Sequence, residues 1–141
     1  MHPEIVAEAR EWLRTPFVWQ ASLKGVGCDC KGLVVGVARE LGRPEAQSLH
    51  AQMASYSLNV PEHELRAGLA ANLTKVAEPE PGDVLLLRLA GKAQHLGVYT
   101  GEGVIHTYGR GPKQVIETSA PVCLRAWPLD SAWRFSLREG G

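Results

Sequence analysis

Apolar residues recur at helical spacing near the start of the chain. The first run covers residues 3–13, has Pro3 near the first helical position and is stopped by Thr15-Pro16. Its apolar face consists of Ile5, Ala9, Trp12 and Leu13. This spacing predicts a short amphipathic helix. Residues 17–27 follow neither the helical nor the strand period and contain two glycines, which is typical of a loop.

A second helical pattern begins at Cys30. Asp29 is a suitable N-cap residue before it, and Gly42 is a suitable stop after it. The apolar positions of this run are Leu33, Val34, Val37 and Leu41. We therefore expect Cys30 in the first turn of a buried helix. Weaker helical patterns follow at residues 48–56 and 61–73.

The pattern changes to short β-type runs after residues 78–83. These runs are rich in branched and aromatic residues, and Gly-containing turns such as Thr100-Gly101-Glu102-Gly103 separate them. The predicted strands are residues 84–89, 95–100, 104–108, 115–117, 124–127 and 133–137. A helical first half followed by an antiparallel meander predicts an α+β fold.

Composition narrows the class of protein. The chain has 141 residues, 45% hydrophobic and 21% charged, which fits one packed domain over residues 1–141. Lys plus Arg and Asp plus Glu are equal at 15 each, so no basic field favours binding to a nucleic acid backbone.

The N-terminus, Met1-His2-Pro3-Glu4-Ile5, lacks a basic segment followed by an apolar run and a cleavage site. No apolar stretch approaches membrane-spanning length. We expect synthesis in the cytoplasm without a Sec signal.

Three cysteines, Cys28, Cys30 and Cys123, cannot all pair, so at least one thiol is expected to be free. A thiol at a helix N-terminus is favoured as a thiolate by unpaired N–H groups and by the helix dipole. Cys30 has that position, and we expect a lowered thiol pKa and a backbone N–H that can stabilise an oxyanion. The alternative is a small buried apolar side chain.

Two of the five histidines fall in the β half. His95 and His106 lie near the same end of two runs joined through the Gly101-Glu102-Gly103 turn, so a hairpin places them side by side. One imidazole can then orient the other, as in a triad of nucleophile, base and orienting group. Half-buried strand histidines with backbone partners are the alternative.

Several segments together resemble the NlpC/P60 peptidases. Gly27-Cys28-Asp29-Cys30-Lys31-Gly32-Leu33 is similar to the nucleophile motif Asp-Cys-Ser-Gly-Leu/Phe, and His95-Leu96-Gly97-Val98-Tyr99 to the base motif His-Val-Gly-Ile-Tyr. Thr15-Pro16-Phe17, Pro81-Gly82-Asp83-Val84-Leu85 and Val104-Ile105-His106 resemble further segments of that family. They occur in family order from about Thr15 to Glu117.

The resemblance implies a papain-like core with Cys30 as nucleophile, His95 as base and His106 as orienting residue. It also implies cleavage of γ-D-glutamyl bonds to diaminopimelate or lysine in peptidoglycan stem peptides, with no cofactor. The short chain resembles the phage-tail or gene-transfer-agent branch, so we expect delivery to the cell wall with a phage-like particle.

The chain departs from the family pattern at two positions near the site. Lys31 replaces the usual Ser, and its positive charge can favour the thiolate form of Cys30 or the binding of an acidic substrate. Phe17 replaces the usual Tyr and so removes a hydroxyl group near the reacting centre. Trp19 lies in the loop that should border the substrate, and Asp29 is expected to cap the helix beside it. These four residues are the candidate substrate-binding set. Cys28 is additional and is expected to pack in the core.

Three other functions stay open. Cys28, Cys30, His95 and His106 can be imagined as a zinc site, although Cys-x-Cys spacing is tighter than the usual zinc motif. A non-catalytic module of a particle is a second alternative. The third is a thiol acyltransferase or amidase acting on another γ-glutamyl substrate, because fold and nucleophile do not fix the acceptor.

Overall fold

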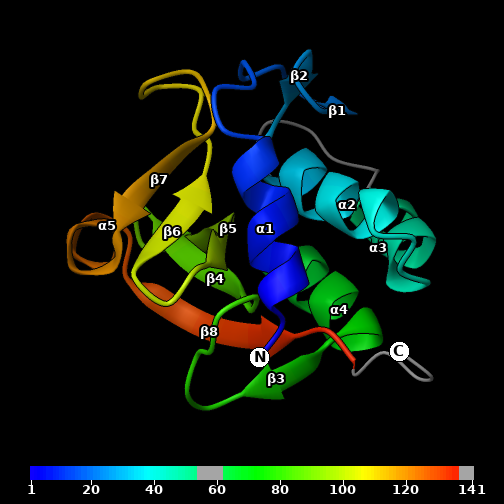
Figure 1. The fold of residues 1–141 in the computed structure, drawn as a ribbon. Helices are drawn as coiled ribbons and strands as arrows, with labels where there is room; N and C mark the ends of the chain where they lie inside the picture. The colour runs from blue at the N-terminus through cyan, green and yellow to red at the C-terminus, as the bar shows by residue number, and fades with distance from the viewer. Residues whose placement is uncertain (54–61, 137–141) are drawn as a thin grey trace.

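The computed structural model describes residues 1–53 and 62–136 and has the expected α+β architecture. Helices dominate the first half of the chain, and one further helix lies near its end (Figure 1). The helices in the described residues are α1 (Pro3–Glu11), α2 (Cys30–Glu40), α3 (Glu45–Met53), α4 (Glu62–Asn72) and α5 (Ala120–Ala126). None of them is long and apolar enough to cross a bilayer.

The main sheet has six strands, all paired antiparallel, in the order β3-β8-β4-β5-β6-β7. Its strands are β3 (Thr74–Val76), β4 (Val84–Leu89), β5 (Lys92–Tyr99), β6 (Gly103–His106), β7 (Ile116–Ser119) and β8 (Leu129–Arg134). A separate two-stranded ribbon pairs β1 (Ser22–Leu23) with β2 (Gly27–Cys28). This ribbon falls in the segment predicted as a loop.

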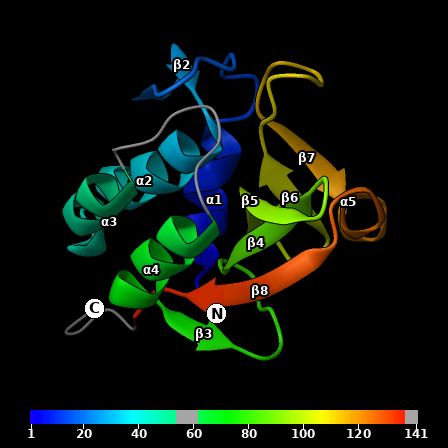
Figure 2. The ribbon, with the colours of Figure 1, turned by 180° about the vertical axis from the view of Figure 1, so that it is seen from behind.

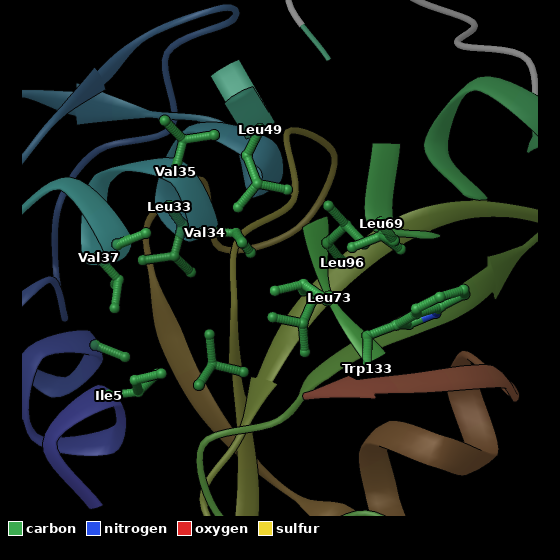
Figure 3. Packing of buried hydrophobic residues seen from close by; sticks show 14 of the residues in the cluster. Ile5, Leu33, Val34, Val35, Val37, Leu49, Leu69, Leu73, Leu96 and Trp133 are labelled. Atoms are coloured by element: carbon green, nitrogen blue, oxygen red, sulfur yellow. The ribbon is translucent and has the colours of Figure 1, made fainter. Parts of the chain in front are cut away.

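Apolar residues cover both faces of the sheet. The larger cluster joins the sheet to α1–α4, and Figure 3 shows its side chains converging from α1, α2, α3, α4, β5 and β8. A smaller cluster on the other face joins Leu85, Leu87 and Val104 to Cys123 of α5. In Figure 2 the sheet separates α2, α3 and α4 from α5. The sheet is therefore the middle layer of the molecule.

Helix α2 begins where the sequence pattern predicts. The Asp29 side chain accepts a hydrogen bond from the backbone N–H of Gly32 at 2.7 Å, which satisfies one of the unpaired donors of the first turn. Gly32 itself allows the preceding loop to pack closely, because a Cβ there would lie 1.9 Å from the Ala21 carbonyl oxygen. The start of α2 is thereby fixed against residues 20–22.

The predicted strand at residues 124–127 is wrong, because residues 120–126 form α5. Pro121 lies in the first turn, where a missing N–H costs nothing, and the helix buries Cys123 against the sheet. The strand predicted at 133–137 instead covers Leu129–Arg134, and residue 137 lies outside the described part. Its polar start is stabilised because Arg66 and Arg88 both bind Asp130.

The remaining boundaries differ by a few residues. Strand β5 starts at Lys92 rather than at His95, and the helix predicted at 48–56 starts at Glu45. Residues 54–56 and residue 61 of the two weaker helix predictions lie outside the described residues.

Cys28 packs in the larger core cluster, fully buried, as expected.

Candidate active site

Cys30 is the first residue of α2 and faces the strand that carries His95. Its sulfur accepts a hydrogen bond from the backbone N–H of Leu96, the residue after His95 in β5. It accepts a second one from the backbone N–H of Lys31. Cys30 and His95 also line the same pocket. The predicted nucleophile and base therefore come together, one from a helix and one from the sheet.

Burial raises the pKa of the Cys30 thiol to about 11, and the neighbouring Asp29 carboxylate acts in the same direction. The Leu96 and Lys31 N–H groups and the Lys31 charge lower it by less. This direction is opposite to the lowered pKa expected from the helix N-terminus, because the loss of hydration outweighs the two N–H groups and the Lys31 charge. The neutral thiol is therefore favoured when the site is empty.

His95 and His106 form the lateral pair that the hairpin predicts. Strands β5 and β6 pair through Val98 with Ile105 and Tyr99 with Val104, which brings the two imidazoles together on one face. His95 Nε2 lies 2.9 Å from His106 Nδ1, and both rings are buried. The other ring nitrogen of His95, Nδ1, takes no part in this contact.

The outer nitrogen of His106 has a partner as well. His106 Nε2 lies 3.0 Å from the Thr118 hydroxyl oxygen on β7. His95, His106 and Thr118 therefore follow one another in one series of contacts, of which the sequence motifs predict only the two histidines.

Aromatic rings enclose the histidine pair. Trp127, at the C-cap of α5, lies 5.3 Å from His95 and 4.9 Å from His106 between ring centroids. Tyr108 lies 5.9 Å from His95. Burial lowers the pKa of His95 to about 3, with the neighbouring His106 acting in the same direction, and burial lowers the pKa of His106 to about 4. Both rings are neutral at physiological pH, as a general base must be.

A pocket of about 620 Å³ opens beside Cys30 and His95. All four predicted substrate-binding residues line it, namely Phe17, Trp19, Asp29 and Lys31. The lining also includes residues that no sequence motif predicts, namely Lys92, Thr107, Tyr108 and Arg110. Their strand-end and loop positions carry no local motif, and only the fold brings them to the site.

The four predicted residues play different parts in this wall. Trp19 is 37% exposed, and its ring lies 6.0 Å from the Lys31 ammonium and 6.3 Å from the Phe17 ring. Asp29 carboxylate oxygens accept the N–H groups of Gly32 and Gln20, so this side chain holds the helix and the loop together. Phe17 and Trp19 supply an apolar edge.

Lys31 is a buried cation directly beside Cys30. Its side chain is almost fully covered, and burial lowers its pKa to about 8 although Cys30, Asp29 and Glu64 act in the opposite direction. Lys92 and Arg110 add two further cationic side chains to the lining. With the Asp29 carboxylate already engaged, the pocket favours an anionic group on the bound molecule.

This arrangement has the parts needed for acyl transfer. It offers a thiol, a neutral imidazole in the same pocket, a second imidazole behind the first, and the backbone N–H of Cys30 at the start of a helix. Within residues 1–53 and 62–136, no group of three or more His, Cys, Asp or Glu side chains is placed to hold a metal ion.

Solved structures share this fold. The NlpC/p60 domain of the peptidoglycan hydrolase SagA has a TM-score of 0.55 and 24% identity, over 95% of this chain and 97% of that one. NlpC2 from Trichomonas vaginalis has a TM-score of 0.67 and 16% identity, over 93% of this chain and 45% of that one. An NlpC/P60 family protein from Bacillus cereus ATCC 10987 has a TM-score of 0.66 and 17% identity, over 96% and 40%. This chain thus spans less than half the length of the Trichomonas vaginalis and Bacillus cereus proteins.

No curated protein matches the sequence. The sequence profile of the NlpC/P60 family, whose members are generally cysteine peptidases, matches residues 14–120. This range includes Cys30, His95, His106 and Thr118, and it covers most of the chain. The chain therefore belongs to the NlpC/P60 family.

Proposed function

We propose that this protein is a cysteine endopeptidase that hydrolyses γ-D-glutamyl-diaminopimelate-type amide bonds in peptidoglycan stem peptides. The observation that carries the proposal is the shared pocket of Cys30 and His95, with His106 fixing the far nitrogen of His95. The name of the similar SagA domain, a peptidoglycan hydrolase, supports the same substrate class.

The geometry supports attack by a thiol that loses its proton as it reacts. Because burial keeps both Cys30 and His95 uncharged in the empty site, the thiol proton passes to His95 Nδ1 as the sulfur attacks the amide carbonyl. The backbone N–H of Cys30, at the start of α2, is the donor for the oxyanion, because the N–H groups of Lys31 and Gly32 already bind the Cys30 sulfur and Asp29.

His95 then returns that proton to the departing amine, and a thioester to the D-glutamyl γ-carbonyl remains on Cys30. A water molecule that gives a proton to His95 attacks the thioester carbonyl, and the C–S bond breaks. His95 passes that proton to the leaving sulfur, so the acid is released and the Cys30 thiol is restored. The second imidazole keeps the His95 ring in one orientation through both steps.

The cationic lining supports an acidic stem peptide as substrate. The D-glutamyl residue of a γ-linked peptide has a free α-carboxylate close to the bond that breaks. Lys31, next to the nucleophile, is the cation best placed to pair with it, and Lys92 and Arg110 face the same pocket. Trp19 and Phe17 supply an apolar edge for the rest of the peptide.

The proposal is tested by digesting a γ-linked stem tetrapeptide in water enriched in ¹⁸O and identifying the products by mass. We expect one ¹⁸O atom in the new glutamyl γ-carboxyl group with the wild type and no product with Cys30→Ala. Cys28→Ala is the matched control, because it removes a core thiol that does not line the pocket. Its activity should remain.

Other outcomes of the same digestion identify the alternatives. A product joined to an added amine instead of water would indicate a thiol acyltransferase. No cleavage of stem peptides, with Cys30 still labelled by a small alkylating reagent, would move the substrate to another γ-glutamyl compound. No cleavage and no labelling would favour a non-catalytic module.

Delivery to the cell wall with a phage-like particle is a separate proposal from the family resemblance. It predicts that the protein co-purifies with tail-like particles from its source cells. Detection of the chain by mass spectrometry in washed particles would support it, and its recovery only in the soluble lysate would contradict it.

A further inference from the structure

The Thr118 side chain continues the polar sequence that starts at the nucleophile. Its hydroxyl oxygen lies 3.0 Å from His106 Nε2, while the other ring nitrogen of His106 lies 2.9 Å from His95 Nε2. Both distances are those of hydrogen bonds. The two contacts use both nitrogens of the His106 ring, so they constrain which nitrogen carries the proton.

The register of the β6–β7 pair explains why Thr118 can make this contact. In the β6–β7 pair, His106 is opposite Ile116 and Val104 is opposite Thr118. Residues two positions apart on a strand share a face, so Thr118 is the diagonal neighbour of His106 on the face that carries the imidazole. Ile116 is directly opposite but has no hydrogen-bonding side chain.

A neutral imidazole has one donor nitrogen and one acceptor nitrogen. If His106 donates from Nε2 to Thr118, its Nδ1 has a lone pair that accepts the Nε2–H of His95. His95 Nδ1 is then unprotonated and can take the thiol proton. If Thr118 donates instead, both rings reverse, and His95 presents an N–H to the thiol and cannot act as the base.

Water is poorly placed to replace the hydroxyl. His106 is 1% exposed, and the Trp127 ring packs 4.9 Å from it. A donor at His106 Nε2 therefore depends on the protein for its acceptor, and in the described structure that acceptor is Thr118.

We propose that Thr118 is a positioning residue whose oxygen accepts the Nε2–H of His106. This contact fixes the tautomer of His106 and, through it, leaves His95 Nδ1 as the base. The role extends the proposed peptidase mechanism and rests on it, but the tautomer itself can be measured without substrate.

The test is a long-range ¹H–¹⁵N NMR correlation on the full chain labelled with ¹⁵N-histidine, at a pH where both rings are neutral. We expect His106 and His95 each to be protonated at Nε2 and unprotonated at Nδ1. Thr118→Val, which keeps the shape but removes the hydroxyl, should give mixed or reversed tautomers. Thr118→Ser should restore the wild-type pattern, and Ser119→Ala, at an exposed neighbouring hydroxyl, should not alter it.

Kinetics on the stem peptide provide a second measurement. Thr118→Val should lower kcat by about tenfold, the rate equivalent of one hydrogen bond, with KM unchanged, and Thr118→Ser should recover it. Nδ1 protonation of His106 in the wild type would overturn the proposal, as would an unchanged tautomer in folded Thr118→Val. If the predicted tautomers are found but no stem peptide is cleaved, the proposed function fails while the role of Thr118 stands.

Discussion

His95 Nε2 and His106 Nδ1 lie 2.9 Å apart across the β5–β6 hairpin, and both rings are buried. The contact leaves His95 with one nitrogen for chemistry, since the other is engaged. It also ties the orientation of the base to the register of the sheet. The two rings therefore differ in position although both are buried, since His95 lines the pocket with Cys30 and His106 lies behind it.

Replacing the two histidines should have unequal effects. His95→Ala removes the general base and should lower kcat by about 10²–10⁴-fold, whereas His106→Ala should lower it by less, because the base remains but loses its orientation. His50→Ala, at an exposed position of α3, should have no effect. Equal losses for His95→Ala and His106→Ala in steady-state kinetics would contradict the division of roles.

Stability should fall on mild acidification because the paired imidazoles are buried in the neutral form. Their pKa values are lowered from 6.5 to about 3 for His95 and about 4 for His106. Between about pH 6.5 and 4 the unfolded chain therefore binds protons that the folded chain does not, and the free energy of unfolding decreases as the pH falls. Each ring contributes about 1.4 kcal/mol per pH unit within its window.

Urea unfolding measured from pH 7.5 to 4.5 checks this slope. His106→Gln removes one of the two titrating rings and should make the slope clearly shallower in that range. The carboxylates with lowered pKa, such as Glu45 and Asp130, lose their contribution only below their usual values near 4, so they act at the acid end of the window. An identical slope in the variant would show that the rings are not buried as neutral groups.

Local patterns were sufficient to predict the parts of the site that lie within one element or one hairpin. The N-cap at Asp29 and the apolar spacing after Cys30 identified α2, and the glycine turn at residues 101–103 identified the β5–β6 hairpin. These signals are local, because a cap or a tight turn is determined by residues adjacent in sequence.

The rest of the site depends on contacts between distant segments. Trp127 contacts the histidines from the end of the helix formed by residues 120–126. The sequence pattern at 124–127 predicts a strand there instead, so this contact was not expected. Thr118 is identified only by the β6–β7 register. The raised pKa of Cys30 results from desolvation by segments that are distant in sequence, which the position at a helix N-terminus alone does not predict.

Gly32 should be essential for stability, since its absent Cβ makes room for the Ala21 carbonyl. Gly32→Ala would place a carbon 1.9 Å from that oxygen and should lower the free energy of unfolding by about 1–3 kcal/mol or more. Gly111→Ala is the matched control, because its Cβ would meet Tyr108 at an ordinary 3.7 Å. Urea unfolding should show a change only for Gly32→Ala, and equal stability of the two variants would refute this packing argument.

Binding of an acidic stem peptide should weaken at alkaline pH if Lys31 pairs with its carboxylate. Its pKa is lowered to about 8, so the ammonium loses its proton as the pH rises through that value, and the KM for a substrate with a free D-glutamyl α-carboxylate should rise. Lys31→Met should raise KM at pH 7 and flatten the dependence. Lys75→Met, at an exposed position on β3, serves as the control. An unchanged KM in Lys31→Met would remove Lys31 from the substrate site.

The most direct test of the central claim is the rate of cleavage of purified peptidoglycan stem peptides by the wild type, Cys30→Ala and Cys28→Ala, with products identified by mass. The Cys30 mechanism predicts cleavage at the D-glutamyl to diaminopimelate bond by the wild type and by Cys28→Ala, and none by folded Cys30→Ala. Cleavage by Cys30→Ala at the wild-type rate would contradict it.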